Sequence, residues 1–196
     1  MPGRGAVLLA ATLAVAGLQV SAAAEGPMAV TRSVLERSNT IVRGSGDRKQ
    51  KLAALSDLLN NFLDTEALAK LAAGSHLEGR SQAETAEFYR LFHDFFVRTY
   101  VQRLLLFDAP DFAYGTETIT GDQAHVGTTV ITPGDRFAVD YTLRRVGAGW
   151  RATDIVVEGV SLARNFRAQF DAAVAKDSFQ GLLDRLRAKV AAGDGS

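Results

Sequence analysis

The spacing of apolar residues changes twice along this sequence, and the change limits the folds that the chain can form. Up to Pro110, apolar residues recur every three or four positions, as in amphipathic helices. After Pro110 they alternate with polar residues, as in half-buried strands, and near Ser161 the helical spacing returns. The pattern predicts helices over about 28–43, 47–62, 64–74 and 82–106, strands over 112–119, 123–131, 136–145 and 149–158, and two closing helices that begin near Ser161 and Asp177.

The connections between the predicted strands are short and rich in turn-forming residues. They read Thr-Gly-Asp, Thr-Pro-Gly-Asp and Gly-Ala-Gly, and loops this short join neighbouring strands in antiparallel order. In the third strand Phe137, Val139, Tyr141 and Leu143 alternate with polar residues, which predicts one packed face and one wet face. We therefore expect an α+β fold, in which a curved four-stranded antiparallel sheet has helices wrapped on one face and forms an apolar cavity with them.

The first residues have the composition of a secretory signal peptide. Arg4 gives a short positive start, an apolar run follows over 5–20, and Ala22-Ala23-Ala24 offers a cleavage site of small residues. The run is shorter than the roughly 20 residues that a membrane-spanning helix needs. The sequence predicts a cleavable signal peptide over 1–24 and a single exported domain over 25–196.

Charge and cysteine content exclude several classes of protein. With 22 basic and 22 acidic residues the formal net charge is zero, so the basic footprint of a nucleic-acid-binding protein is missing. The chain has no Cys, which excludes thiol catalysis and cysteine-ligated zinc or iron–sulfur centres. The histidines show no spacing typical of a metal site. We expect no metal and no cofactor.

The segment Gly159-x-Ser161-x-Ala163 lies between a predicted strand and a predicted helix, and it is similar to the nucleophile elbow of a serine hydrolase. In an α/β-hydrolase the catalytic His follows the nucleophile in chain order. All three histidines of this chain precede Ser161, and the predicted strands are antiparallel. We therefore expect Ser161 to cap the helix that follows it.

Acid–base chemistry inside the cavity is the remaining enzymatic alternative. Asp140 neighbours Tyr141 on a strand and so is expected to face solvent, whereas Asp154 shares the parity of Trp150 and is expected to face inward. An inward carboxylate of this kind could serve a small-ligand isomerase. Pairing of such a carboxylate with an arginine is more common than catalysis, and we expect that the protein is not an enzyme.

The stretch from Trp150 to Phe170 carries the most specific pattern in the chain. Its elements are Trp150, Asp154, the run Val157–Leu162, Asn165-Phe166-Arg167 and Gln169-Phe170. This pattern resembles the C-terminal signature of the MlaC or toluene-tolerance family. Other segments resemble the same family: Phe62-Leu63-Asp64 with Leu68 and Gly74, and Val97-Arg98-Thr99-Tyr100. One segment departs from it, because many members carry Trp shortly after the glycine where this chain has Gly74-Ser75-His76.

The resemblance implies a soluble periplasmic carrier that holds a phospholipid by its acyl tails. It also implies transient contacts with an outer-membrane lipoprotein complex and with an inner-membrane ABC transporter, in a system that maintains the lipid asymmetry of the outer membrane. A branch of the family accompanies hopanoid biosynthesis, so a polycyclic lipid is the alternative ligand. The signature itself is expected to be structural, with Arg167 paired to a carboxylate such as Asp154.

The periodicity of the long helix and of the sheet selects the residues that are expected to contact lipid tails. These residues either line a cavity or fill a solid core, and periodicity does not separate the two cases. The predicted lipid-binding set is Phe92, Phe95, Phe96, Tyr100, Val139, Tyr141, Leu143, Trp150, Val156, Phe166 and Phe170.

Overall fold

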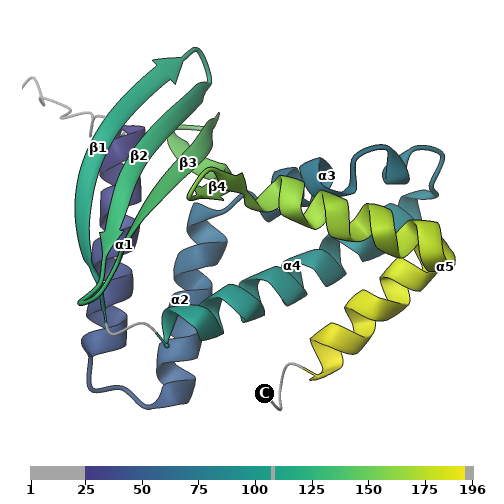
Figure 1. The fold of residues 1–196 in the computed structure, drawn as a ribbon, viewed down its shortest axis with the longest axis horizontal. Helices are drawn as coiled ribbons and strands as arrows, with labels where there is room; N and C mark the ends of the chain where they lie inside the picture. Colours follow the sequence, from purple (N-terminus) through teal and green to yellow (C-terminus); the bar gives the residue numbers. More distant parts are fainter. Residues whose placement is uncertain (1–24, 107–108, 193–196) are drawn as a thin grey trace, which may run out of the picture.

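The computed structural model describes residues 25–106 and 109–192, so the predicted signal peptide over 1–24 lies outside the described residues. Helices come first, then strands, then a long bent helix, in the order that the hydrophobic spacing predicts (Figure 1). The helices are α1 (Pro27–Arg43), α2 (Arg48–Phe62), α3 (Thr65–Ala73), the short 3₁₀ helix η1 (Gly74–Leu77), α4 (Gln82–Leu104) and α5 (Leu162–Ala192). The strands are β1 (Asp111–Thr120), β2 (Gln123–Ile131), β3 (Arg136–Val146), β4 (Gly149–Val157) and β5 (Val160–Ser161).

The sheet is an open antiparallel meander in which each strand pairs with the next one in the chain. It contains five strands, so the prediction of four strands was wrong, because it omitted the short strand β5. Glu158 and Gly159 form the connection, with φ angles of 49° and 77°, and positive φ at both central residues is typical of a tight two-residue hairpin turn. The turn folds Val160 back onto Val157. A strand of two residues is too short to show a period in the sequence.

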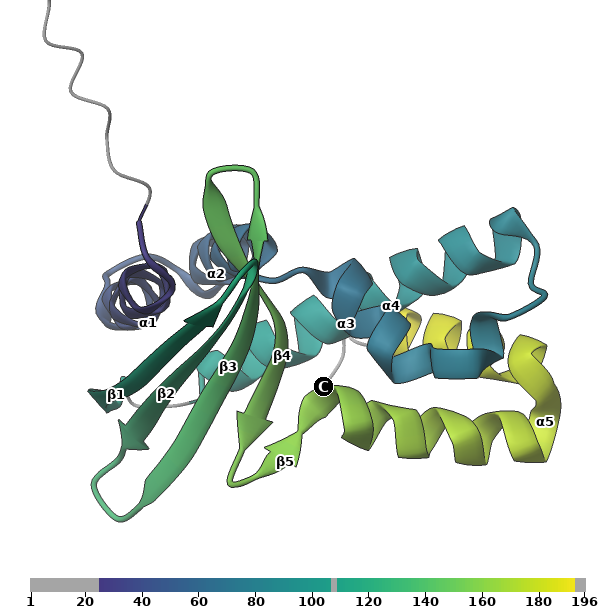
Figure 2. The same ribbon diagram turned by 90° about the horizontal axis from the view of Figure 1, so that it is seen from above.

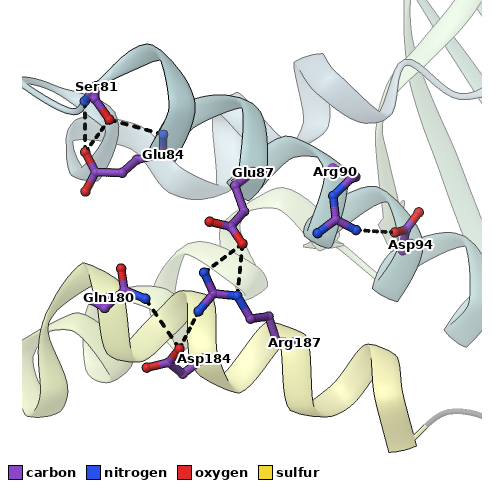
Figure 3. Close-up of polar contacts among 8 residues, drawn as sticks. All are labelled: Ser81, Glu84, Glu87, Arg90, Asp94, Gln180, Asp184 and Arg187. Atoms are coloured by element: carbon purple, nitrogen blue, oxygen red, sulfur yellow. Dashed lines mark hydrogen bonds and ion pairs between the residues drawn. The ribbon is translucent and has the colours of Figure 1, made fainter.

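Side-chain caps begin the helices where the sequence predicts them. Asp47 accepts a hydrogen bond from the backbone N–H of Gln50 at 2.8 Å, and the Gln50 side chain accepts one from the Asp47 N–H in return. Ser81 and Glu84 make the same reciprocal capping box at the start of α4 (Figure 3). Hydrogen bonds from Ser81 lower the pKa of the Glu84 carboxyl. These caps satisfy N–H groups that the first helical turn leaves unpaired.

The last helix is sharply bent, and both predicted closing helices are present as its two arms (Figure 1). Ser178 breaks the helix, because its φ of 82° and ψ of 172° are not helical. Gly181 donates its backbone N–H to the Ser178 hydroxyl at 3.4 Å, so Ser178 caps the second arm. From the second arm, the Arg187 guanidinium donates a hydrogen bond to the Glu87 carboxylate of α4 at 2.7 Å (Figure 3).

The arrangement in space has two parts that share helix α4. In one part α1 lies against β1 and β2, and α2 lies between α1 and α4. In the other part the two arms of α5 pack with α3 and with α4, beyond the edge of the sheet (Figure 2). The helix α4 crosses from one part to the other.

Candidate functional site

A cavity of about 360 Å³ lies under the sheet, between α1 and the C-terminal end of α4. Its volume is in the range of pockets that bind small molecules. The lining comes from α1, α4, β1, β2, β3, β4 and the first residue of α5, and from the connection before β1. The lining residues are Leu35, Ser38, Asn39, Val42, Tyr100, Arg103, Leu104, Ala109, Pro110, Phe112, Val130, Phe137, Val139, Tyr141, Ile155, Val157 and Leu162.

The inner face of the sheet forms one wall because the alternation of β3 is uninterrupted there. Val139 and Tyr141 are 7% and 6% exposed, whereas Asp140 between them faces away and is exposed. Directly opposite residues in an antiparallel pair point to the same side. Val157 pairs with Val139 and Ile155 pairs with Tyr141, so both join the cavity wall.

A bulge in β4 reverses the parity on which the sequence prediction relied. Thr142 pairs with Asp154 and Leu143 with Ala152, so Thr153 is the extra residue in β4. After the bulge Val156 pairs with Asp140 and shares its outward side. The predicted contact residue Val156 therefore lies on the other face of the sheet, and its neighbours Ile155 and Val157 take the inward positions.

Most polar groups in the lining are satisfied within the protein. The Ser38 hydroxyl donates to the Leu35 carbonyl at 2.7 Å, and the Asn39 amide donates to the Pro110 carbonyl at 2.6 Å. Burial raises the pKa of the Tyr141 phenol well above its ordinary value, and a hydrogen bond with Thr128 opposes that shift only in part. Because its phenol stays neutral at ordinary pH, Tyr141 adds no charge to the cavity wall.

Five of the predicted residues lie in a different place, in an aromatic cluster between α4 and α5. Phe92 is fully buried, and its ring centroid lies 5.4 Å from that of Phe166 in an edge-to-face arrangement. Phe96 stacks on Tyr100 at 4.4 Å and so connects this cluster to the cavity wall. We name the cluster the aromatic core and define it as Phe88, Phe92, Phe95, Phe96, Phe166, Phe170 and Phe179.

The other predicted residues divide between the cavity and the rest of the core. Tyr100, Val139 and Tyr141 line the cavity. Leu143 is fully buried, and Trp150 is 4% exposed with the Arg145 guanidinium 4.3 Å above its ring. Neither is among the residues that line the cavity.

Sequence reasoning missed the wall that α1 supplies and much of the inner face of the sheet. The helical spacing of α1 was visible in the sequence, but the spacing does not show which element the apolar face of α1 packs against. Phe137 was visible too, since it alternates in step with Val139 and Tyr141. The missed lining positions include Leu35, Val42, Phe112, Val130, Phe137, Ile155 and Val157.

The signature around Ser161 is a structural corner, which confirms the predicted cap. Ser161 accepts a hydrogen bond from the Arg164 N–H at 3.1 Å, and its hydroxyl donates to the Asp154 carboxylate. Asp154 also accepts the N–H groups of Ala163 at 3.0 Å and of Ile155 at 2.9 Å. Asp154 thus joins β4 to the start of α5, and it is not among the residues that line the cavity.

Arg167 has a different partner from the one that the sequence suggested. It donates to the carbonyls of Leu71 and Ala72 at the end of α3, at 2.6 and 3.1 Å, and not to Asp154. Its guanidinium lies over Gly74, where an added Cβ would come within 1.8 Å of the Arg167 Cζ atom. The signature residues Gly74 and Arg167 therefore fit together, because only glycine leaves room for the arginine that caps α3.

Within the described part of the chain, none of the helices combines the length and the apolar character needed to cross a membrane. The same residues contain no cluster of three or more His, Asp and Glu side chains that could hold a metal ion.

Comparison with known proteins gives one family and one fold. The family described as "MlaC protein" matches residues 29–188. Among solved structures, the chain is similar to a phospholipid-binding protein from Ralstonia solanacearum, solved in complex with a phospholipid. The two chains are 20% identical, with a TM-score of 0.76 over 87% of this chain and 99% of the other. No curated protein matches the chain.

Proposed function

The chain belongs to the MlaC family, and on this premise we propose that it is a lipid carrier that holds the acyl chains of a phospholipid in the cavity under the sheet. The observation that carries the proposal is the cavity itself, which is walled mainly by aliphatic and aromatic side chains and has the exposed Arg103 in its lining. The similar protein from Ralstonia supports the choice of ligand, because it carries a phospholipid on the same fold.

The energetics favour a protein carrier over free diffusion. Two acyl chains with about 30 methylenes between them would cost roughly 24 kcal/mol to expose to water, at about 0.8 kcal/mol per methylene. A cavity of this composition is about as apolar as the interior of a bilayer. Transfer between the two is therefore close to neutral, and the carrier needs neither a covalent step nor a cofactor.

We propose a narrower set of tail contacts than the periodicity indicates. Tyr100, Val139 and Tyr141 keep this role because they line the cavity. Phe137, Ile155 and Val157 join them on the sheet, and Leu35 and Val42 on α1. Phe92, Phe95, Phe96, Phe166 and Phe170 support the helix that forms the floor.

The proposal includes a location and partners that follow from the family. Residues 1–24 act as a cleavable signal peptide, and the domain over 25–196 works in the periplasm. There it exchanges lipid with an outer-membrane lipoprotein complex and with an inner-membrane ABC transporter. Because the sequence contains no nucleotide-binding motif, the energy for directional transport comes from the transporter.

Lipid mass spectrometry on the purified exported protein, after denaturing extraction, tests the proposal. We expect about one phospholipid per chain. A polycyclic lipid in its place would assign the protein to the hopanoid-associated branch of the family. Recovery of a small water-soluble ligand would favour the isomerase alternative, and recovery of no lipid at all would contradict the carrier function.

A further inference from the structure

Charge is sparse among the described residues that line the cavity. Among the described lining residues, Arg103 alone has a formal charge. The polar side chains of Ser38 and Asn39 donate to backbone carbonyls. The arginine is therefore the polar lining group best able to meet a ligand.

The position of Arg103 joins the apolar wall to water. Its guanidinium carbon lies 5.4 Å from the ring centroid of Tyr100, which is part of the cavity wall. The side chain itself is exposed, and Leu106, three residues further on, is 80% exposed. Within residues 25–106 and 109–192, no carboxylate forms an ion pair with Arg103.

We infer that Arg103 binds the phosphate group of the lipid at the cavity mouth, and that the protein selects lipids that carry a phosphate at that position. This inference rests on the proposed function, since it assumes that acyl chains occupy the cavity. It names the class of ligand: a phosphate-bearing lipid is favoured over a diacylglycerol or a polycyclic lipid that lacks phosphate.

The chemistry suits a guanidinium in this place. Arginine presents a planar set of donors that matches two oxygens of a phosphate, and such charge-assisted pairs are stronger than neutral hydrogen bonds. The Tyr100 ring excludes water from one side, and burial raises the pKa of its phenol, which places Arg103 beside a partly desolvated surface. A phosphate that rests here keeps its other oxygens in water. The contact therefore recognises the phosphate that all such lipids share, and leaves the rest of the head group in solvent.

Competition between two lipids with identical acyl chains tests the inference. The lipid-stripped full mature chain is incubated with vesicles that contain equal amounts of phosphatidylglycerol and diacylglycerol, and the bound lipids are measured by mass spectrometry. We expect the wild type to be enriched in phosphatidylglycerol, and Arg103→Gln to lower the ratio of the two bound lipids about tenfold, the size of one charge-assisted hydrogen bond. Arg103→Lys, which keeps the charge but loses the planar fork, should give an intermediate ratio.

One control variant and the behaviour of the wild type separate the possible failures. Arg90→Gln removes an exposed arginine from the same helix, where it pairs with Asp94 at 3.2 Å (Figure 3), and should leave the ratio unchanged. A wild type that binds neither lipid would contradict the proposed function. A wild type that binds lipid, with the same ratio as Arg103→Gln, would overturn the role of Arg103 alone.

Inorganic phosphate distinguishes a lipid head group from a free anion. At 10 mM it should leave the bound phosphatidylglycerol in place, because the acyl chains hold the lipid. If phosphate binds the lipid-free chain through Arg103 while the lipid ratio stays the same in Arg103→Gln, the site would be one for free anions and the inference would be wrong. Circular dichroism of each variant checks that it is folded.

Discussion

The two parts of the molecule use aromatic and aliphatic residues in opposite ways. Between α4 and α5, the aromatic core is closely packed, with ring centroids 5.4 to 6.1 Å apart in the pairs that hold it together. Under the sheet, side chains of the same kinds surround a cavity of about 360 Å³. A single helix takes part in both, since Phe92 lies in the first part and Tyr100 in the second.

The difference lies in the partner of each surface. Two helices can interlock their side chains, and α5 does so along the Phe88 to Phe96 side of α4. The sheet and α1 instead meet the C-terminal end of α4 around the cavity, which residues from all three line. We conclude that the aromatic core stabilises the fold, and that the cavity gives up packing contacts to leave room for a ligand.

The largest effect is expected from removing a ring of the aromatic core. Phe92→Ala should lower the free energy of unfolding by about 3–5 kcal/mol, because a fully buried ring is lost and its neighbours cannot collapse into the space. The matched change in the other part is Phe137→Ala, which removes a half-buried ring from the cavity wall and should cost about 1–2 kcal/mol. Urea denaturation measures both. Equal costs would mean that the two parts do not differ in packing.

The next effect is on lipid recovery, with little change in stability. Val139→Trp extends a large side chain into the cavity and should lower the lipid recovered per chain by about tenfold, since the space for an acyl chain is lost. The control is Val156→Trp on the outward side of the neighbouring strand, which should leave recovery unchanged. The same loss in both variants would show that the effect comes from damage to the sheet and not from the cavity.

This pair of variants also shows where prediction from sequence reached its limit. The helices, the first four strands and the cap at Ser161 could be predicted, because each depends on residues close together in the chain. The direction of Val156 depends on an extra residue in β4, and a bulge leaves no mark in the alternation of apolar residues.

The sequence also did not show which aromatic residues lie in the aromatic core and which line the cavity, for a similar reason. Periodicity identified the apolar surfaces of α4 correctly. Which surface meets α5 and which meets the cavity depends on the bend at Ser178 and on the corner at Ser161, and these are properties of the whole fold. The sequence therefore predicted the kind of site better than its residues.

A smaller effect concerns the pH dependence of stability, and it belongs to the cavity wall. Burial raises the pKa of the Tyr141 phenol in the folded protein. In the unfolded chain the same phenol ionises near pH 10. Above that pH the unfolded state releases a proton that the folded state keeps, so this group should lower the free energy of unfolding by about 1 kcal/mol between pH 10 and 11. Tyr141→Phe should remove that part of the slope between pH 10 and 11 in urea denaturation, and it should keep the lipid. An unchanged slope would mean that Tyr141 is not the group responsible.

The smallest effect is expected at the bend in α5, and it should raise stability. Ser178 has a positive φ that is unfavourable for any residue with a Cβ atom. Glycine adopts this conformation without steric cost, and it costs only a few tenths of a kcal/mol when it replaces serine at a helix start. Ser178→Gly should therefore raise the free energy of unfolding by about 0.5–1 kcal/mol, with lipid recovery unchanged, because Ser178 is not among the residues that line the cavity under the sheet. Ser75→Gly, in the short helix η1, is a control for the effect of an added glycine on the unfolded chain. A gain in stability that also changed lipid recovery would show that the two parts are coupled through α4, and the distinction between a supporting part and a binding part would fail.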